Sequence, residues 1–262
     1  MAILRTAFTM LVVAVLTATF ALVIIVSAVL GVPNRAGSLY DVLPRLWSRA
    51  ILWAAGVSVQ IHGLERFRTG GPFIFICNHV SLFDIPALVG WLPRNNFVAK
   101  AELFRIPVFG PGIRVLGTVP IERDNQKAAF GSYDVASRRI HNGSSVVVFP
   151  EGTRGCEYPI RAFKKGPFVL AIKAGAPIVP VVVHGTIEIL PKGSLLVHPG
   201  NIDVYMLDSV PTAGLQYSDR DTLAQTVRER MQKCMQKCMQ ERTHERTQEP
   251  MQEITSSLHP QT

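Results

Sequence analysis

The chain has 262 residues, of which 48% are hydrophobic and 18% charged. This length and composition exclude the class of proteins that are too short or too polar to bury a core. The formal net charge is +8, and the whole excess lies before residue 214. Such a basic region suits an anionic partner: nucleic acid, phospholipid head groups or a phosphorylated substrate. The four cysteines lack the spacing of a zinc site or of a secreted disulfide framework, which indicates a reducing compartment.

The first segment of note is an apolar run. Residues 6–31 contain no charged residue and are long enough to cross the roughly 30 Å hydrocarbon layer with some tilt. A cleaved signal peptide is the alternative, but its apolar region has only about 7 to 15 residues. Arg5 precedes the run whereas Arg35, Arg45 and Arg49 follow it, which favours a cytoplasmic position for the following domain. We therefore predict a segment that lies in lipid.

Residues 42–58 predict an amphipathic helix. Arg45 and Arg49 stand one turn apart, with apolar residues at helical spacing on the other face. Two interpretations stay open: a helix at the bilayer surface, or an ordinary helix packed on the core. In either case residues 1–58 are expected to form a membrane-facing module. The apolar residues are Leu43, Leu46, Trp47, Ala50, Trp53 and Ala54.

Beyond residue 56 short apolar runs alternate with turn and helix signals. Helices are expected at 125–141 and 162–174. Continuous apolar strands between helices indicate an α/β domain over residues 59–213, with a mixed, largely parallel central sheet covered by helices on both faces. Chemistry in such domains lies beyond the strand ends. The predicted strands are VSVQIHG, FIFICN, NFVAK, TVPIE, SVVVFP, PIVPVVVHG and IDVYML.

Residues 214–262 form the C-terminal segment. A helix is expected from near Asp221 through the repeated MQKCMQKCMQ. The residues after it have mixed charges and no apolar period, which predicts a mobile tail. Cys234 and Cys238 lie one turn apart and are interpreted as two thiols on one helix face rather than a lipidation or metal site.

A histidine and an aspartate follow the strand FIFICN. The strand is expected to end at Asn78, and Asp84 suits a helix N-cap with Pro86 in the first turn. Two residues five apart on one helix would point about 140° apart, but a loop histidine and a cap aspartate can meet. A carboxylate that orients His79 would leave its other ring nitrogen free to take a proton from a hydroxyl. The alternative for this spacing is an ordinary surface pair or loop cap.

No protein nucleophile is needed if the attacking hydroxyl belongs to the substrate. Ser81 lies nearby, and Cys77 alternates with strand residues and is predicted to lie in the core.

Basic residues recur where predicted strands end. In FPEGTR a Gly-Thr pair frees backbone N–H groups, and the guanidinium of Arg154 suits phosphate or carboxylate. Each basic residue alone would be a solvated side chain, whereas their recurrence predicts an anion site. The other basic residues of this kind are Lys100, Arg123, Lys164 and Lys165.

In this order, NHVSLFD, KAEL, GTVPIER, FPEGTR with FKKG, and APIVPV resemble the motifs of the glycerolipid acyltransferases typified by bacterial lysophosphatidic acid acyltransferase. The resemblance covers about residues 58–210. It implies that His79 is the catalytic base and Asp84 its partner, and that residues 178–181 support the acyl or glycerol site. Arg123 is implied to bind the glycerol phosphate. The substrate-binding residues implied in this way are Lys100, Arg123, Glu151, Gly152, Thr153 and Arg154.

The resemblance implies transfer of a fatty acyl group from acyl-CoA or acyl carrier protein to the sn-2 hydroxyl of lysophosphatidic acid, which gives phosphatidic acid. The expected partners are membrane lipid and the acyl donor, with no nucleic acid, cofactor or metal; the oligomeric state stays open. The expected location is the inner or cytoplasmic membrane, with the catalytic domain facing the cytoplasm.

Other functions stay open. Pro120 and the Gly155-Cys156 pair depart from the family pattern and leave substrate selectivity undecided. Alternatives are another acceptor, such as glycerol 3-phosphate or a lyso-ornithine lipid, a membrane-bound hydrolase, or a non-catalytic adaptor that binds anionic lipid.

Overall fold

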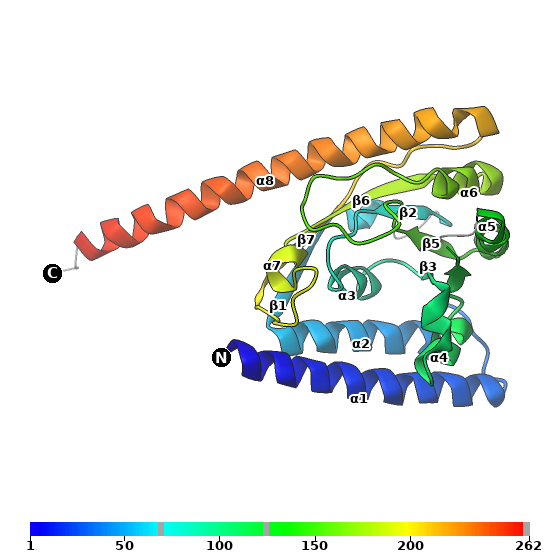
Figure 1. Ribbon diagram of the computed structural model, residues 1–262, viewed down its shortest axis with the longest axis horizontal. Helices are drawn as coiled ribbons and strands as arrows, with labels where there is room; N and C mark the ends of the chain where they lie inside the picture. The colour runs from blue at the N-terminus through cyan, green and yellow to red at the C-terminus, as the bar shows by residue number, and fades with distance from the viewer. Residues whose placement is uncertain (68–70, 123–125, 259–262) are drawn as a thin grey trace.

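The computed structural model describes residues 1–67, 71–122 and 126–258, with side chains described except at 126–130 and 243–258. Within this part the strands form one seven-stranded sheet in the order β1-β7-β6-β2-β5-β3-β4 (Figure 1). All seven predicted strands are confirmed. Their bounds are β1 Val57–His62, β2 Ile74–Cys77, β3 Asn95–Lys100, β4 Val119–Ile121, β5 Ser145–Val148, β6 Ile178–His184 and β7 Gly200–Met206.

The sheet is mixed, as predicted. Strands β6, β2, β5, β3 and β4 are parallel to one another, whereas β7 runs antiparallel to β6 and pairs in parallel with β1. Strand β2 lies between β6 and β5, with Cys77 paired to Val181 and Ile76 to Val148. The carboxyl ends of three neighbouring parallel strands therefore meet at one edge of the sheet, and the loops that follow them can share a site.

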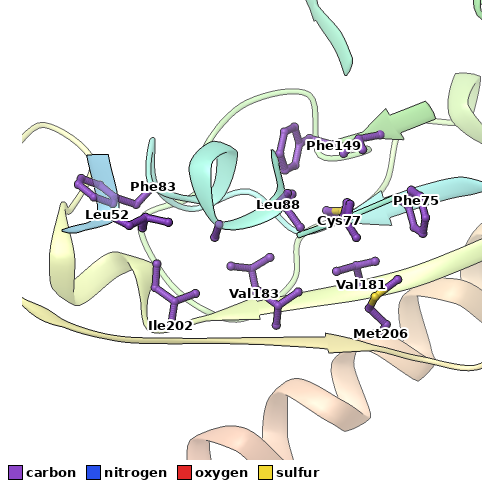
Figure 2. Packing of buried hydrophobic residues seen from close by; sticks show 14 of the residues in the cluster. Leu52, Phe75, Cys77, Phe83, Leu88, Phe149, Val181, Val183, Ile202 and Met206 are labelled. Atoms are coloured by element: carbon purple, nitrogen blue, oxygen red, sulfur yellow. The ribbon is translucent and has the colours of Figure 1, made fainter. Parts of the chain in front are cut away.

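The central strands β2, β5 and β6 are buried on both faces, which explains their unbroken apolar sequences. Along β2 the side chains of Phe75 and Cys77 enter one core cluster and those of Ile74 and Ile76 the other, all at 0% exposure. Figure 2 shows part of the first cluster. The predicted core position of Cys77 is confirmed.

Helices complete the two layers. The first cluster includes side chains of α2 (Leu39–Ala55) and α3 (Asp84–Val89), and the second includes side chains of α5 (Gln126–His141), α6 (Gly166–Ala174) and α8 (Arg220–Leu258). Helix α6 begins four residues later than predicted because the Lys164 N–H bonds the Pro150 carbonyl and so holds the preceding chain against the loop after β5. Short elements fill the connections: η1 Leu64–Phe67, η2 Ala101–Arg105, α4 Phe109–Val115, α7 Thr186–Ile189 and η3 Tyr217–Asp219.

Helix α1 (Ala2–Val29) forms an outer layer against α2 (Figure 1). The rings of Phe8 and Trp53 meet edge to face with centroids 6.0 Å apart, and the Trp47 indole donates to the Thr17 hydroxyl at 2.9 Å. Near its other end α1 lies so close to α4 that a Cβ on Gly112 would lie 2.9 Å from that of Ala21. Helix α1 therefore packs on the protein along most of its length.

The outer face of this helix pair is apolar. Helix α1 is the one described helix long and apolar enough to cross a membrane. Exposed large apolar side chains occur along it and along α2: Ile3, Leu4, Phe8, Met10, Leu11, Val15, Leu22, Val23, Val26, Val29, Val42, Leu46 and Trp53.

Helix α2 packs on the core along one face and exposes a large apolar residue on another, so core packing, one of the two interpretations of its sequence, is confirmed. Ile51 and Leu52 are buried in the core, whereas Trp53 is 73% exposed. Arg45 and Arg49 point toward the end of α3 and donate to the carbonyls of Leu92 and Gly90. Cations are favoured beside carbonyls at a helix end.

Helix α8 begins close to the predicted position and continues to Leu258, where the sequence predicted a mobile tail. The missing apolar period does not prevent helix formation, since Glu, Gln and Arg in this stretch are intrinsically good helix formers. Its first turns belong to the core, whereas its C-terminal half extends away from the domain (Figure 1).

Candidate active site

The site is centred on His79, the second residue after β2. Its Nδ1 lies 2.8 Å from Asp84 Oδ2, and its ring stacks on Phe149 with centroids 4.1 Å apart. The His79 side chain is 12% exposed and that of Asp84 is 0% exposed. Among the described residues, none hydrogen-bonds the other ring nitrogen, Nε2. A bond from Nδ1–H to a carboxylate fixes the tautomer in which Nε2 can accept a proton.

Asp84 holds more than the histidine. Its Oδ2 also accepts the N–H groups of Val80 at 2.8 Å and Ser81 at 2.9 Å, and its Oδ1 accepts the hydroxyl of Thr186 at 2.6 Å. Four donors thus converge on a side chain that, as a carboxylate, only accepts. Helix α3 begins at Asp84 itself, so this residue closes the turn from His79 as well as orienting the ring.

The Glu151 carboxylate fixes the histidine from the other side. Its Oε1 accepts the His79 N–H at 2.9 Å, and its Oε2 accepts Nε of Arg161 at 2.8 Å. The same guanidinium donates to the Thr153 carbonyl. The Glu151 side chain is only 2% exposed, and both of its oxygens accept hydrogen bonds from other residues of the protein, His79 and Arg161.

The loop after β2 is tied to β6 and to the loop after β5. The Asn78 amide exchanges two hydrogen bonds with the backbone of Val183, at 2.9 and 2.8 Å. Gly155 N–H bonds the His79 carbonyl at 2.8 Å. Ser81 is buried and donates to the Leu190 carbonyl at 2.8 Å, so its hydroxyl is used in structure. The imidazole therefore sits on a backbone fixed at several points.

The chain is similar in sequence and in fold to known proteins. The sequence model of a family described as "Acyltransferase" matches residues 58–184. A protein named putative 1-acyl-sn-glycerol-3-phosphate acyltransferase from Caenorhabditis elegans is 35% identical over 67% of this chain and 64% of its own length. The human protein named 1-acyl-sn-glycerol-3-phosphate acyltransferase alpha is 32% identical over 71% of this chain and 67% of its own length.

The chain belongs to this acyltransferase family. The fold agrees: the crystal structure of the 1-acyl-sn-glycerophosphate acyltransferase from Thermotoga maritima superposes with a TM-score of 0.78, at 24% identity, over 91% of this chain and 96% of that one. The matched part of this chain spans less than two thirds of the length of several relatives. It covers 44% of a Brassica napus protein that is also named 1-acyl-sn-glycerol-3-phosphate acyltransferase.

The other residues that the sequence predicted to bind substrate lie in different surroundings. Gly152 and Thr153 lie in the turn after β5, where Gly152 has φ +78° and a Cβ would come within 3.1 Å of the Lys164 side chain. The carbonyl of Arg154 accepts the ammonium of Lys192 at 3.0 Å. Lys100 forms an exposed ion pair with Glu102 at 2.9 Å. Arg123 lies outside the described residues.

Two residues that lie near the pair of His79 and Asp84 were missed in the sequence analysis. Arg161 stands ten positions after Glu151 in a loop without periodicity, and no local pattern connects the two. Thr186 had a usable signal, because HGT at the end of β6 repeats the strand-then-Gly-Thr pattern of FPEGT. Since β6 neighbours β2, a hydroxyl there is well placed to reach the loop of His79.

The reactivity of the cysteines can test the burial of Cys77 beside the site. Burial, with the nearby charge of Asp84, raises the pKa of the Cys77 thiol well above its ordinary value, so it stays protonated at neutral pH. Cys156 is exposed. Brief treatment of the native protein with iodoacetamide is expected to alkylate Cys156 and leave Cys77 unmodified in peptide mass spectra. Modification of Cys77 at the rate of Cys156 would contradict its burial.

Proposed function

We propose that the protein transfers a fatty acyl group from a thioester donor, acyl-CoA or acyl carrier protein, to the sn-2 hydroxyl of lysophosphatidic acid. One observation carries the proposal: a carboxylate-oriented histidine with a free Nε2 at the carboxyl ends of β2, β5 and β6. The names of the relatives favour this acceptor.

In the proposed reaction His79 acts first as general base and then as general acid. Its Nε2 takes the proton of the lysolipid hydroxyl as the oxygen attacks the thioester carbonyl carbon. Asp84 stabilises the imidazolium that results. The tetrahedral intermediate then collapses, the carbon–sulfur bond breaks, and His79 returns the proton to the leaving thiolate. The protein's own groups thus complete the proton transfers, and the products are phosphatidic acid and a free thiol.

The neighbouring groups support this role by restricting the ring. Phe149 covers one face of the imidazole, and Glu151 fixes the backbone from which the side chain emerges. Orientation of this kind lowers the barrier because the ring needs no reorganisation during the reaction. Within the motif we therefore propose that Glu151 positions His79, and that Lys100, Arg123 and Arg154 supply positive charge for the acceptor phosphate.

The helix pair α1 and α2 would place this site at a membrane. If α1 crossed the bilayer, its neighbours α2 and α4 would enter the hydrocarbon with it. They would bring charged side chains into the bilayer, and each charge at its centre costs several kcal/mol of free energy. These side chains are Asp41, Arg45, Arg49 and Arg114. A helix that lies in one leaflet, with its exposed apolar side chains among the lipid chains, avoids this cost. A lipid with one acyl chain could then reach His79 from the same leaflet.

The test is an acceptor panel with the purified full chain in lipid vesicles. With one acyl-CoA, thiol release and lipid mass spectrometry are followed for lysophosphatidic acid, glycerol 3-phosphate, a lyso-ornithine lipid, and no acceptor. We expect acceptor-dependent thiol release with phosphatidic acid as the main product. Thiol release without acceptor would indicate a hydrolase, and vesicle binding without turnover an adaptor. Repeating the panel with an acyl carrier protein identifies the donor.

Thr186 gives a more specific prediction. Thr186→Val removes the donor to Asp84 Oδ1 while keeping the shape of a side chain that is 0% exposed. A carboxylate that has lost one of four donors can tilt, and misplacement near the chemistry costs up to about 10²-fold in rate. We expect kcat to fall about ten- to a hundredfold with little change in either KM. Thr186→Ser is the control, since it keeps the hydroxyl and should restore most of kcat. Equal kcat values for the Val and Ser variants would exclude a positioning role.

A further inference from the structure

The loop between α7 and β7, residues 191–199, has two exposed leucines. Leu195 is 80% exposed and Leu196 43% exposed, whereas the next residue, Val197, is fully buried. A single exposed leucine is ordinary on a soluble surface. Here two adjacent leucines are exposed on a fixed loop, next to a larger apolar surface. Contiguous exposed apolar surface of this kind indicates an interaction site.

Hydrogen bonds fix this loop at both ends. Ser194 N–H bonds the Pro191 carbonyl at 3.1 Å, and Leu196 N–H bonds the Ser194 hydroxyl at 3.0 Å. His198 N–H bonds the Ile189 carbonyl at 2.9 Å. The loop is therefore a preformed turn, and little conformational entropy would be lost if its leucines were buried in a partner.

The loop also joins the apolar face of α1. Val197 N–H bonds the hydroxyl of Thr6 in the first turns of α1 at 2.9 Å. The same end of α1 exposes Ile3 and Leu4, at 74% and 73%. Figure 1 shows the α7–β7 loop descending to the N-terminal end of α1. The leucines thus extend the apolar surface of the helix pair beyond the helices themselves.

On its other side the loop is connected to the active site. The carbonyl of Leu190 accepts the hydroxyl of Ser81, two residues after His79. The ammonium of Lys192 bonds the carbonyl of Arg154 and remains exposed. A positive charge next to the leucines suits anionic lipid head groups, with the leucines deeper among the acyl chains.

We propose that the 191–199 loop is a second membrane contact, which inserts Leu195 and Leu196 into the same leaflet as α1 and holds the active-site edge against the lipid surface. The occupant is a bilayer rather than a protein, because the loop continues the lipid-facing surface of α1. This inference rests on the proposed function insofar as α1 lies in the leaflet.

The experiment compares two added tryptophans in the full chain. Leu195→Trp probes the loop. Tyr217→Trp probes η3, where Tyr217 is 56% exposed. Element η3 directly precedes α8, which lies on the side of the sheet away from α1 (Figure 1). Vesicles contain phosphatidylglycerol and phosphatidylcholine brominated on its acyl chains, and the emission of the parent protein with its own three tryptophans is subtracted. We expect the added emission at position 195 to shift to shorter wavelength and to be quenched, and that at 217 to do neither.

Equal quenching at the two positions, while the parent tryptophans are quenched, would overturn the loop proposal and leave membrane binding by α1 standing. If the parent does not bind the vesicles at all, both ideas fail. A kinetic comparison adds a functional readout, using the ratio of kcat/KM for vesicle-borne acceptor to that for a monomeric short-chain acceptor. For the Leu195→Ser, Leu196→Ser variant we expect this ratio to fall at least about tenfold, since the full burial of one leucine alone is worth about that factor, and we expect no fall for Tyr217→Ser.

Discussion

Replacing His79 with alanine is expected to lower kcat/KM for acyl transfer by about 10²- to 10⁴-fold, because the variant has no base at the position of Nε2. The fold should persist. The side chain contributes one hydrogen bond and one ring contact at the end of a strand, and Asp84 keeps three other donors. Thiol release with lysophosphatidic acid measures the activity, and thermal unfolding measures the stability.

The chain contains its own matched control. His62 Nε2 lies 3.0 Å from Asp203 Oδ1, a second histidine–aspartate pair on β1 and β7, and the His62 ring stacks on Tyr205. The side chains of His62 and Asp203 are 43% and 22% exposed, whereas those of His79 and Asp84 are 12% and 0% exposed. His62→Ala should leave acyl transfer close to the parent level. If both histidine variants retained parent activity, the general-base mechanism would be wrong.

The strands and the contact between His79 and Asp84 could be predicted because their signals are local. A buried strand between two layers of helices leaves an apolar run in the sequence, as in residues 73–77, and the first polar residues after it mark the strand end. The five-residue spacing of His79 and Asp84 is closed by a single turn, so their contact needed no knowledge of distant segments.

The surroundings of the pair depended on distant contacts. Glu151 was assigned to substrate on the resemblance, yet its carboxylate bonds the backbone 72 positions earlier and Arg161 ten positions later. Thr186 reaches Asp84 across 102 positions because β6 pairs with β2. Strand order determines such contacts, and a single sequence does not reveal strand order.

The apolar N-terminal run shows the same limit. Its composition indicated lipid but left open whether it crosses the bilayer or lies in one leaflet. That distinction depends on packing: Thr17 and Ala21 contact α2 and α4, which places charged neighbours beside the helix. Contacts with other elements, more than hydropathy, thus bear on whether such a helix would cross a bilayer or lie in one leaflet.

Asp84→Asn is expected to lower kcat by about 10³- to 10⁴-fold with little effect on either KM. The amide can keep the bonds to His79, Val80 and Ser81 through its oxygen, provided that its NH₂ faces Thr186, whose hydroxyl can rotate to accept. The turn and the tautomer then survive, but the negative charge opposite the imidazolium is lost. A comparable carboxylate-to-amide change beside a catalytic histidine costs about 10⁴-fold in kcat where the amide also leaves the ring in the wrong tautomer, so this figure is an upper bound for the loss of charge alone.

Asparagine is the sharper substitution because alanine would also leave the Val80 and Ser81 N–H groups without their acceptor, at about 1–3 kcal/mol each. We therefore expect Asp84→Ala to unfold at a clearly lower temperature and Asp84→Asn to remain near the parent. Asp203→Asn, in the exposed pair with His62, controls for loss of a carboxylate elsewhere on the sheet and should keep kcat. A stable Asp84→Asn variant with parent kcat would mean that the carboxylate only closes the turn, and that the imidazole works without a charged partner.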